Sequence, residues 1–152
     1  MPHSPLLNSR RTAIAGAVML LLSSAHSTAR TLARGSLPEQ RWYEAANDMK
    51  RLAESLGDQP YGAVLVLDGK LVGEAPSRVI KIQNPDAHAE REAIHDAQRR
   101  LGRTDLSGAV LYSTSRPCSL CEAAAAQAAV SRMYFGSPLA DGGAPQIGRA
   151  HV

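Results

Sequence analysis

The 152-residue chain has little cysteine, few aromatic residues and a small net charge. It contains 2 cysteines, and aromatic residues make up 4% of the sequence. The formal net charge is +3, and the basic excess lies at the N-terminus because the first acidic residue is Glu39. The aromatic residues are not interleaved with basic ones. The sequence therefore lacks the basic footprint of a nucleic-acid-binding surface, and its 44% hydrophobic residues fit one globular domain rather than a disordered acidic tail.

The chain also has no long hydrophobic run. Residues 13–22 are uncharged and apolar, but a segment of this length spans only about half of a ~30 Å hydrocarbon core. Arg10 and Arg11 precede this run and small residues follow it, which is the order of a secretory signal. We therefore expect residues 1–29 to be a signal peptide that is removed, which leaves no stable membrane span. The alternative is an uncleaved membrane anchor.

The same segment bears on localisation. The pair Arg10-Arg11 resembles a twin-arginine signal. Removal of both arginines lowers the 17 basic residues to 15, against 14 acidic ones, so the mature chain is nearly neutral. We expect the protein to be exported, periplasmic or secreted, with a linker at residues 30–37 and one domain over residues 38–152.

Helical and strand patterns alternate through this domain. Apolar residues recur at three- and four-residue spacing from Pro38 to Gly57, which predicts an amphipathic helix. Asp68-Gly69 separates two aliphatic strands as a hairpin turn. A second helix is expected to be capped by Asn84 and to end at Gly102. The remaining predicted segments are a strand over 109–112, an alanine-rich helix over 119–129 and a strand over 132–136.

The order of these elements, α-β-β-α-β-α-β, predicts an α/β fold. The hairpin is antiparallel, whereas the β-α-β crossovers favour parallel pairing at the end of the chain. We therefore expect a three-layer α/β/α sandwich with a mixed central sheet.

Cys118 and Cys121 form a Cys-x-x-Cys pair at the predicted start of the last helix. Three residues are close to one helical turn, so both sulfur atoms lie on one face, and the positive end of the helix favours thiolates. Two thiolates suit a zinc ion. In an exported protein the same pair can instead form a disulfide or a redox site.

His88-Ala89-Glu90 precedes this pair in the sequence. With the two thiolates, His88 completes three ligands of a tetrahedral zinc site, and water takes the fourth position. Zinc lowers the pKa of such water to about 7, and Glu90, as a non-ligand, can carry the proton. Alternatively, Glu90 is an ordinary first-turn glutamate that stabilises the helix dipole. The pattern predicts one Zn²⁺ per chain.

His88-x-Glu90 followed by Pro117-Cys118-x-x-Cys121 is the signature of zinc-dependent nucleobase deaminases. Over almost the whole expected mature chain, the sequence resembles the zinc-dependent cytidine/deoxycytidylate deaminase superfamily. It is most similar to the branch of guanine deaminases and tRNA adenosine deaminases. The similar segments are residues 61–64, 88–94, 111–114 and 132–136.

The resemblance implies a cytidine deaminase-like fold with zinc bound by His88, Cys118 and Cys121 and with Glu90 as the catalytic proton carrier. The implied reaction is hydrolytic deamination of a guanine-, adenine- or cytosine-type ring, which releases ammonia. Backbone amides around Ala89 would line the substrate site. The alternatives are a non-catalytic zinc-binding or redox module on the same fold, and an adenosine deaminase that acts on tRNA or another nucleic acid.

Three features depart from the pattern of this family. Ser77 stands where relatives usually carry an asparagine that contacts the substrate, so Ser77 is the candidate for that contact. Arg116 stands where a glutamate is frequent. Residues 137–152 are rich in Gly, Ala and Pro, where relatives continue with another helix and strand. Either the pocket is more open here, or a partner subunit closes it.

The expected partner is therefore a small-molecule nucleobase or nucleoside. We expect nucleic acid not to be the substrate, because an exported enzyme meets no tRNA and the mature chain is nearly neutral. A homodimer is expected from the resemblance alone.

Overall fold

The computed structural model describes residues 38–148, and the expected signal peptide (1–29) and linker (30–37) lie outside these residues. The helices are α1 (Pro38–Ser55), α2 (Ala89–Leu101) and α3 (Ser119–Gln127). The strands are β1 (Gly62–Leu67), β2 (Lys70–Pro76), β3 (Val110–Ser113), β4 (Arg132–Phe135) and β5 (Ala140–Gly143). Within the described part of the chain, no helix combines the length and hydropathy needed to cross a membrane.

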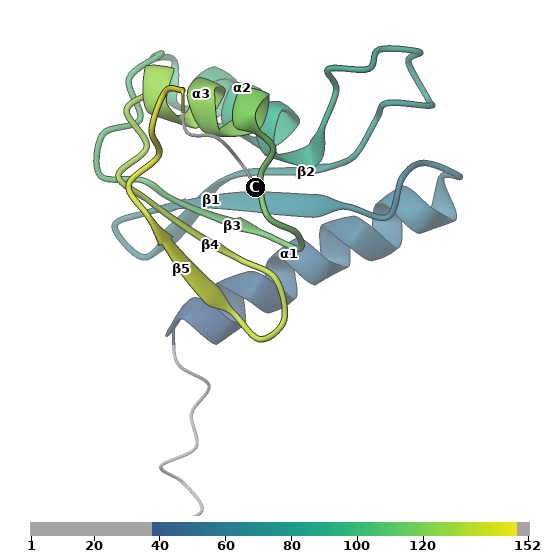
Figure 1. Cartoon of the computed structure of the whole chain (residues 1–152), viewed down its shortest axis with the longest axis horizontal. Helices are drawn as coiled ribbons and strands as arrows, with labels where there is room; N and C mark the ends of the chain where they lie inside the picture. The colour runs from purple at the N-terminus through teal and green to yellow at the C-terminus, as the bar shows by residue number, and fades with distance from the viewer. Residues whose placement is uncertain (1–37, 149–152) are drawn as a thin grey trace, which may run out of the picture. The chain divides into compact units, whose positions relative to one another are not determined.

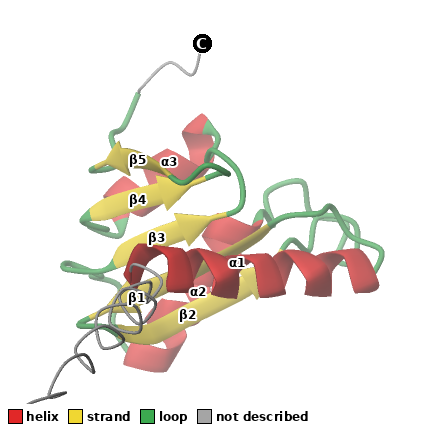
Figure 2. Ribbon diagram, turned by 90° about the horizontal axis from the view of Figure 1, so that it is seen from below, coloured by secondary structure: helices red, strands yellow, loops and turns green. Residues whose placement is uncertain are grey.

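The strands form one mixed sheet in the order β2-β1-β3-β4-β5 (Figures 1 and 2). The strand β1 is antiparallel to β2 and β3, and β3 is parallel to β4. This arrangement confirms the predicted mixed sheet and the hairpin at Asp68-Gly69. The strand β5 was not predicted, because the sequence Ala-Asp-Gly-Gly contains no β-branched or aromatic residue. It pairs with β4, and Arg132 at the start of β4 bonds Asp141 of β5 at 3.0 Å.

Helices cover both faces of the sheet, as predicted. Alternate residues of β1 face opposite layers: Val64 and Val66 pack with Ala46 of α1, whereas Ala63 and Leu65 pack in the core that includes α2 and α3. Figure 1 shows α1 on one side of the sheet and α2 and α3 on the other. Burial on both faces explains why β1 reads as a continuous aliphatic run rather than an alternating one.

The helix α2 packs closely on the sheet and so fixes the position of its own N-terminus. A Cβ atom at Gly73 of β2 would lie 2.5 Å from the carbonyl oxygen of Ala93 in α2. Glycine at this position therefore allows direct contact between the two backbones. The C-terminal end of α2 is as predicted, because Gly102 adopts a left-handed cap with φ of 64°.

The predicted start of α2 was wrong. The helix begins at Ala89, with His88 as its N-cap, and not at Asn84-Pro85. The Asn84 side chain instead accepts a hydrogen bond at 2.9 Å from the backbone of Asp86, two residues on. Asparagine forms such local turns as readily as it caps helices. Smaller boundary differences occur at β3, which runs to Ser113, and at α3, which ends at Gln127.

Candidate zinc centre and active-site cavity

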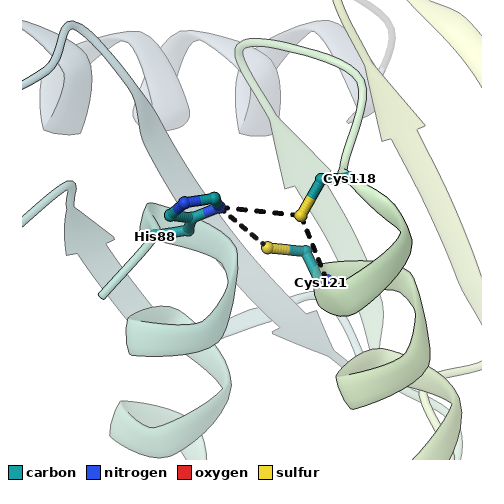
Figure 3. A group of neighbouring side chains, drawn as sticks. All are labelled: His88, Cys118 and Cys121. Carbon is teal, nitrogen blue, oxygen red and sulfur yellow. Dashed lines mark hydrogen bonds between the residues drawn. The ribbon is translucent and has the colours of Figure 1, made fainter. Parts of the chain in front are cut away.

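Two helix N-termini bring the predicted metal ligands together. His88 is the N-cap of α2 and Cys118 is the N-cap of α3, while Cys121 lies in the first turn of α3. Both N-cap residues have extended backbone conformations, so their side chains are free of the helical rotamer constraints. Figure 3 shows the three side chains pointing toward one another.

The distances between the ligand atoms fit a zinc ion. The Nδ1 atom of His88 lies 3.7 Å from Sγ of Cys118 and 3.4 Å from Sγ of Cys121. Zinc–sulfur bonds of ~2.3 Å and zinc–nitrogen bonds of ~2.0 Å at tetrahedral angles place S and N about 3.6 Å apart. Within residues 38–148, these three residues are the group whose ligand atoms converge in this way. The donor set and its spacing therefore match a three-ligand zinc site.

The two cysteines differ in exposure. Both thiols are free, and Cys121 is fully buried while Cys118 is half-buried. In the metal-free protein, burial raises the pKa of the Cys121 thiol, and the nearby carboxylate of Glu90 raises it further. The Cys121 backbone N–H donates to Sγ of Cys118 at 3.4 Å, which orients that sulfur. A bound divalent cation reverses the cost of forming the thiolates.

Glu90 is buried beside this group. Its exposed fraction is 4%, and the hydroxyl of Ser113 donates to its Oε1 atom at 2.8 Å. Ser113 is the last residue of β3, so the bond joins the start of α2 to the sheet. Burying a carboxylate carries a desolvation cost, which the hydrogen bond from Ser113 offsets in part. Glu90 is therefore a buried, hydrogen-bonded carboxylate beside the ligand group.

A cavity of about 370 Å³ opens over the ligand group. This volume lies in the range of small-molecule sites. Its lining residues are Gln59, Tyr61, His88, Ala89, Glu90, Ser115, Arg116 and Cys118. Ala89, which was predicted to line the substrate site through its backbone, is the first residue of α2, where backbone N–H groups lack helical partners. No described residue after Cys118 lines the cavity, so the segment 137–148 does not close it.

Ser77, the predicted substrate contact, lies outside this lining. It is 1% exposed, and its hydroxyl donates to Oδ1 of Asp58 at 2.9 Å. The same carboxylate accepts bonds from the backbone N–H groups of Gln59, Ile80 and Lys81 at 2.8, 3.0 and 2.8 Å. Burial raises the pKa of Asp58, but these hydrogen bonds outweigh it and hold the pKa below its usual value. In this structure Ser77 therefore helps to fix the segment that leads to His88.

Sequence reasoning did not assign Gln59, Tyr61, Ser115 and Ser113 to the site. Their position follows from strand pairing: Thr114 and Gly62 exchange hydrogen bonds of 3.0 and 3.1 Å. The residues before β1 therefore border those after β3. Antiparallel pairing of these strands would have predicted this neighbourhood, but the order of elements alone does not establish which strands pair.

The fold and the converging histidine and cysteine side chains define an α/β/α zinc-binding protein. Residues 37–137 match the family described as "Cytidine and deoxycytidylate deaminase zinc-binding region". The chain belongs to this family, which confirms the resemblance stated from the sequence. The metal of the family is zinc, and His88, Cys118 and Cys121 are positioned as potential ligands of such an ion.

Curated relatives carry two kinds of name. A tRNA-specific adenosine deaminase of Agrobacterium fabrum is 40% identical over 99 residues, which cover 63% of this chain and 65% of that protein. A guanine deaminase of Bacillus subtilis is 40% identical over 62 residues, which cover 41% of this chain and 40% of that protein. The chain thus spans less than two thirds of the length of these relatives.

Solved structures give the same pair of similarities. One, from studies of A-to-I editing by tRNA:A34 deaminases, has a TM-score of 0.62 and 38% identity, covering 64% of this chain and 70% of that chain. The guanine deaminase structure from Bacillus subtilis has a TM-score of 0.62 and 30% identity, covering 64% and 62%. These neighbours confirm the cytidine deaminase-like fold.

Proposed function

We propose that this chain is a hydrolytic deaminase that removes an amino group from a nucleobase or nucleoside and releases ammonia. The observation that carries the proposal is the buried carboxylate of Glu90, which lines the same cavity as the ligands His88 and Cys118. Family membership supports the reaction class, and the names of the relatives support a purine-type ring.

In the proposed reaction, three residues bind the metal and Glu90 transfers protons. His88, Cys118 and Cys121 would hold the zinc ion, which when bound supplies Lewis acidity toward water. Glu90 transfers one proton from the attacking water to the ring nitrogen, which keeps it, and then transfers the second proton, from the added hydroxyl, to the amino group. A carbon–oxygen bond forms, the carbon–nitrogen bond breaks, and ammonia leaves. The hydroxyl of Ser113 donates to Oε1 of Glu90, which holds this carboxylate in a fixed orientation.

The experiment measures zinc content and ammonia release together, across guanine, adenine, cytosine and their nucleosides. We expect about one zinc per chain and turnover of one member of the panel. Glu90→Gln should keep the zinc and lower kcat about 10²- to 10⁴-fold. Glu92→Gln is the matched control, because Glu92 lies in the same helical turn, pairs with Arg78 and does not line the cavity.

Two results would overturn the proposal. One is a Cys118–Cys121 disulfide in a protein that takes up no zinc, which would favour a redox module. The other is a zinc-loaded protein without turnover of any candidate, which would favour a non-catalytic zinc-binding module on this fold.

A second candidate function is deamination of adenosine in tRNA. It is supported by the names of several curated relatives, which include tRNA-specific adenosine deaminases of Aquifex aeolicus and Bacillus subtilis. The sequence argument against nucleic acid depends on export, and the expected signal peptide lies outside the described residues. A tRNA substrate therefore belongs in the panel, and turnover of tRNA alone would replace the small-molecule proposal.

A further inference from the structure

The cavity has different polar groups at its buried end and at its opening. The buried end contains the metal ligands and Glu90, which is 4% exposed. The opening is formed by Gln59, Tyr61, Ser115 and Arg116, which are half-buried or exposed. We call these four residues the rim. Its amide, hydroxyl and guanidinium groups can all donate hydrogen bonds, and no carboxylate belongs to it.

Arg116 is the cation of the rim, and its side chain has no partner within the described part of the chain. Among residues 38–148, no hydrogen bond or ion pair engages its side chain, and it is exposed. By contrast, Arg100 bonds Glu74 and Asp96, and Arg132 bonds Asp141. The guanidinium of Arg116 is therefore free to pair with a group that enters the cavity.

The backbone holds the rim residues next to one another. The reciprocal bonds between Gly62 and Thr114 join the start of β1 to the end of β3. Gln59 is held in addition by the bond from its backbone N–H to Asp58. The donors of Gln59, Ser115 and Arg116 thus come from two adjoining, fixed segments rather than from separate flexible loops.

We propose that the rim binds an anionic substituent, a phosphate or a carboxylate, of the substrate whose ring enters the cavity. This inference rests on the proposed deaminase function and specifies its substrate class. A guanidinium and neutral donors that line the same cavity suit a single anion, which Arg binds through two parallel hydrogen bonds. Among the described residues, Arg116 is the one lysine or arginine that lines this cavity, so the rim offers a site for one anion rather than for a chain of phosphates. The substrate class is therefore an anionic small molecule.

The test compares four substrates that carry the same base: the nucleoside, its 5′-monophosphate, its 5′-carboxylate and a single-stranded oligonucleotide. With the zinc-loaded protein, we expect kcat/KM to be highest for one of the two anionic small molecules, and the preferred one identifies the anion. In Arg116→Gln, the ratio of kcat/KM for that anion to kcat/KM for the nucleoside should fall about 10- to 100-fold. Arg116→Lys should restore part of the ratio.

Arg103→Gln is the matched control for the loss of one positive charge, because Arg103 is exposed and lies away from the cavity. It should leave the ratio unchanged. Equal kcat/KM for nucleoside and anionic substrates, an equal loss for both in Arg116→Gln, or a preference for the oligonucleotide would each overturn the proposal.

A binding measurement separates this inference from the proposed function. Titration of the same ligands into zinc-loaded Glu90→Gln protein by calorimetry needs no turnover. If the wild-type protein deaminates nothing but the anionic ligand binds more tightly than the nucleoside, and Arg116→Gln abolishes that difference, the reaction is wrong and the rim assignment stands. If turnover occurs and no such difference exists, the rim assignment is wrong and the reaction stands.

Discussion

The two helices that carry the candidate metal ligands reach the site by different routes. The helix α3 follows β3 after a short segment, and Cys118 begins it directly. The helix α2 follows β2 only after the long turn segment 77–87, whose ends are joined by a 3.0 Å bond from Arg78 N–H to the carbonyl of Ala87. Asp58, distant in sequence, supports that segment through Ser77, Ile80 and Lys81. The position of the two cysteines is thus fixed by residues near them in the sequence. The position of His88 depends on a contact with Asp58, which is distant in sequence.

The largest expected effect is a loss of zinc affinity when a cysteine at the start of α3 is replaced. Replacement Cys121→Ser removes a buried thiol that contacts His88 Nδ1 at 3.4 Å. Because even partners outside the ligand group change metal affinity 10- to 100-fold, loss of this ligand should weaken zinc binding more than about 100-fold. Competition with a zinc chelator measures it.

The matched control is Ser119→Ala, an exposed position in the same first turn of α3. It should bind zinc as the wild type does. Unchanged affinity in Cys121→Ser would contradict the assigned ligand group.

A smaller effect, on stability, is expected when Asp58 is replaced. Asp58→Ala leaves the donors of Ser77, Ile80 and Lys81 without their shared carboxylate, and it should lower the free energy of unfolding by about 1–3 kcal/mol. Urea denaturation of the zinc-free protein measures this loss. The control is Asp48→Ala, because Asp48 lies on the exposed side of α1. Asp68→Ala is not a suitable control, because Asp68 has a positive φ of 50°.

The contribution of Asp58 should depend on pH. Its pKa is lowered in the folded protein, so the unfolded state binds more protons in acid. The stabilisation is therefore present above the ordinary value of 3.8 and is lost as pH falls through the lower, folded-state value. The stability difference between wild type and Asp58→Asn should shrink below pH 3.8, and a difference that grows in acid would contradict the assignment.

The smallest effect is expected at Asn84. If Asn84 capped α2, Asn84→Ala would cost about 1 kcal/mol. Its side chain instead makes an exposed turn bond to Asp86, so we expect a loss below about 0.5 kcal/mol. Urea denaturation decides between the two values, and circular dichroism should show unchanged helix content.

The same comparison explains what the sequence could predict. The sequence Pro117-Cys118-x-x-Cys121 contains its own helix start, so the start of α3 was predicted correctly from local spacing. Before His88, Asn84-Pro85 fits a helix cap and a turn equally well. The segment that contains it is supported by Asp58, which is distant in sequence, through bonds with Ser77, Ile80 and Lys81. The layers and the mixed sheet were predicted from the order of the elements, with its hairpin and its β-α-β crossovers. The strand β5 was not predicted, because it depends on backbone pairing to β4 and its four residues have no strand pattern.

The outer edges of the sheet bear on how copies of this chain can associate. A bare strand edge invites a second copy to extend the sheet, which leads to aggregation. Here one edge is β5, which is four residues long and carries Asp141, and the other is β2, which begins with Lys70 and ends with Pro76. Short length, charge and proline all discourage strand addition. Among the described residues, both edges of the sheet therefore resist strand addition by a second copy, and the sheet is protected against growth into fibres.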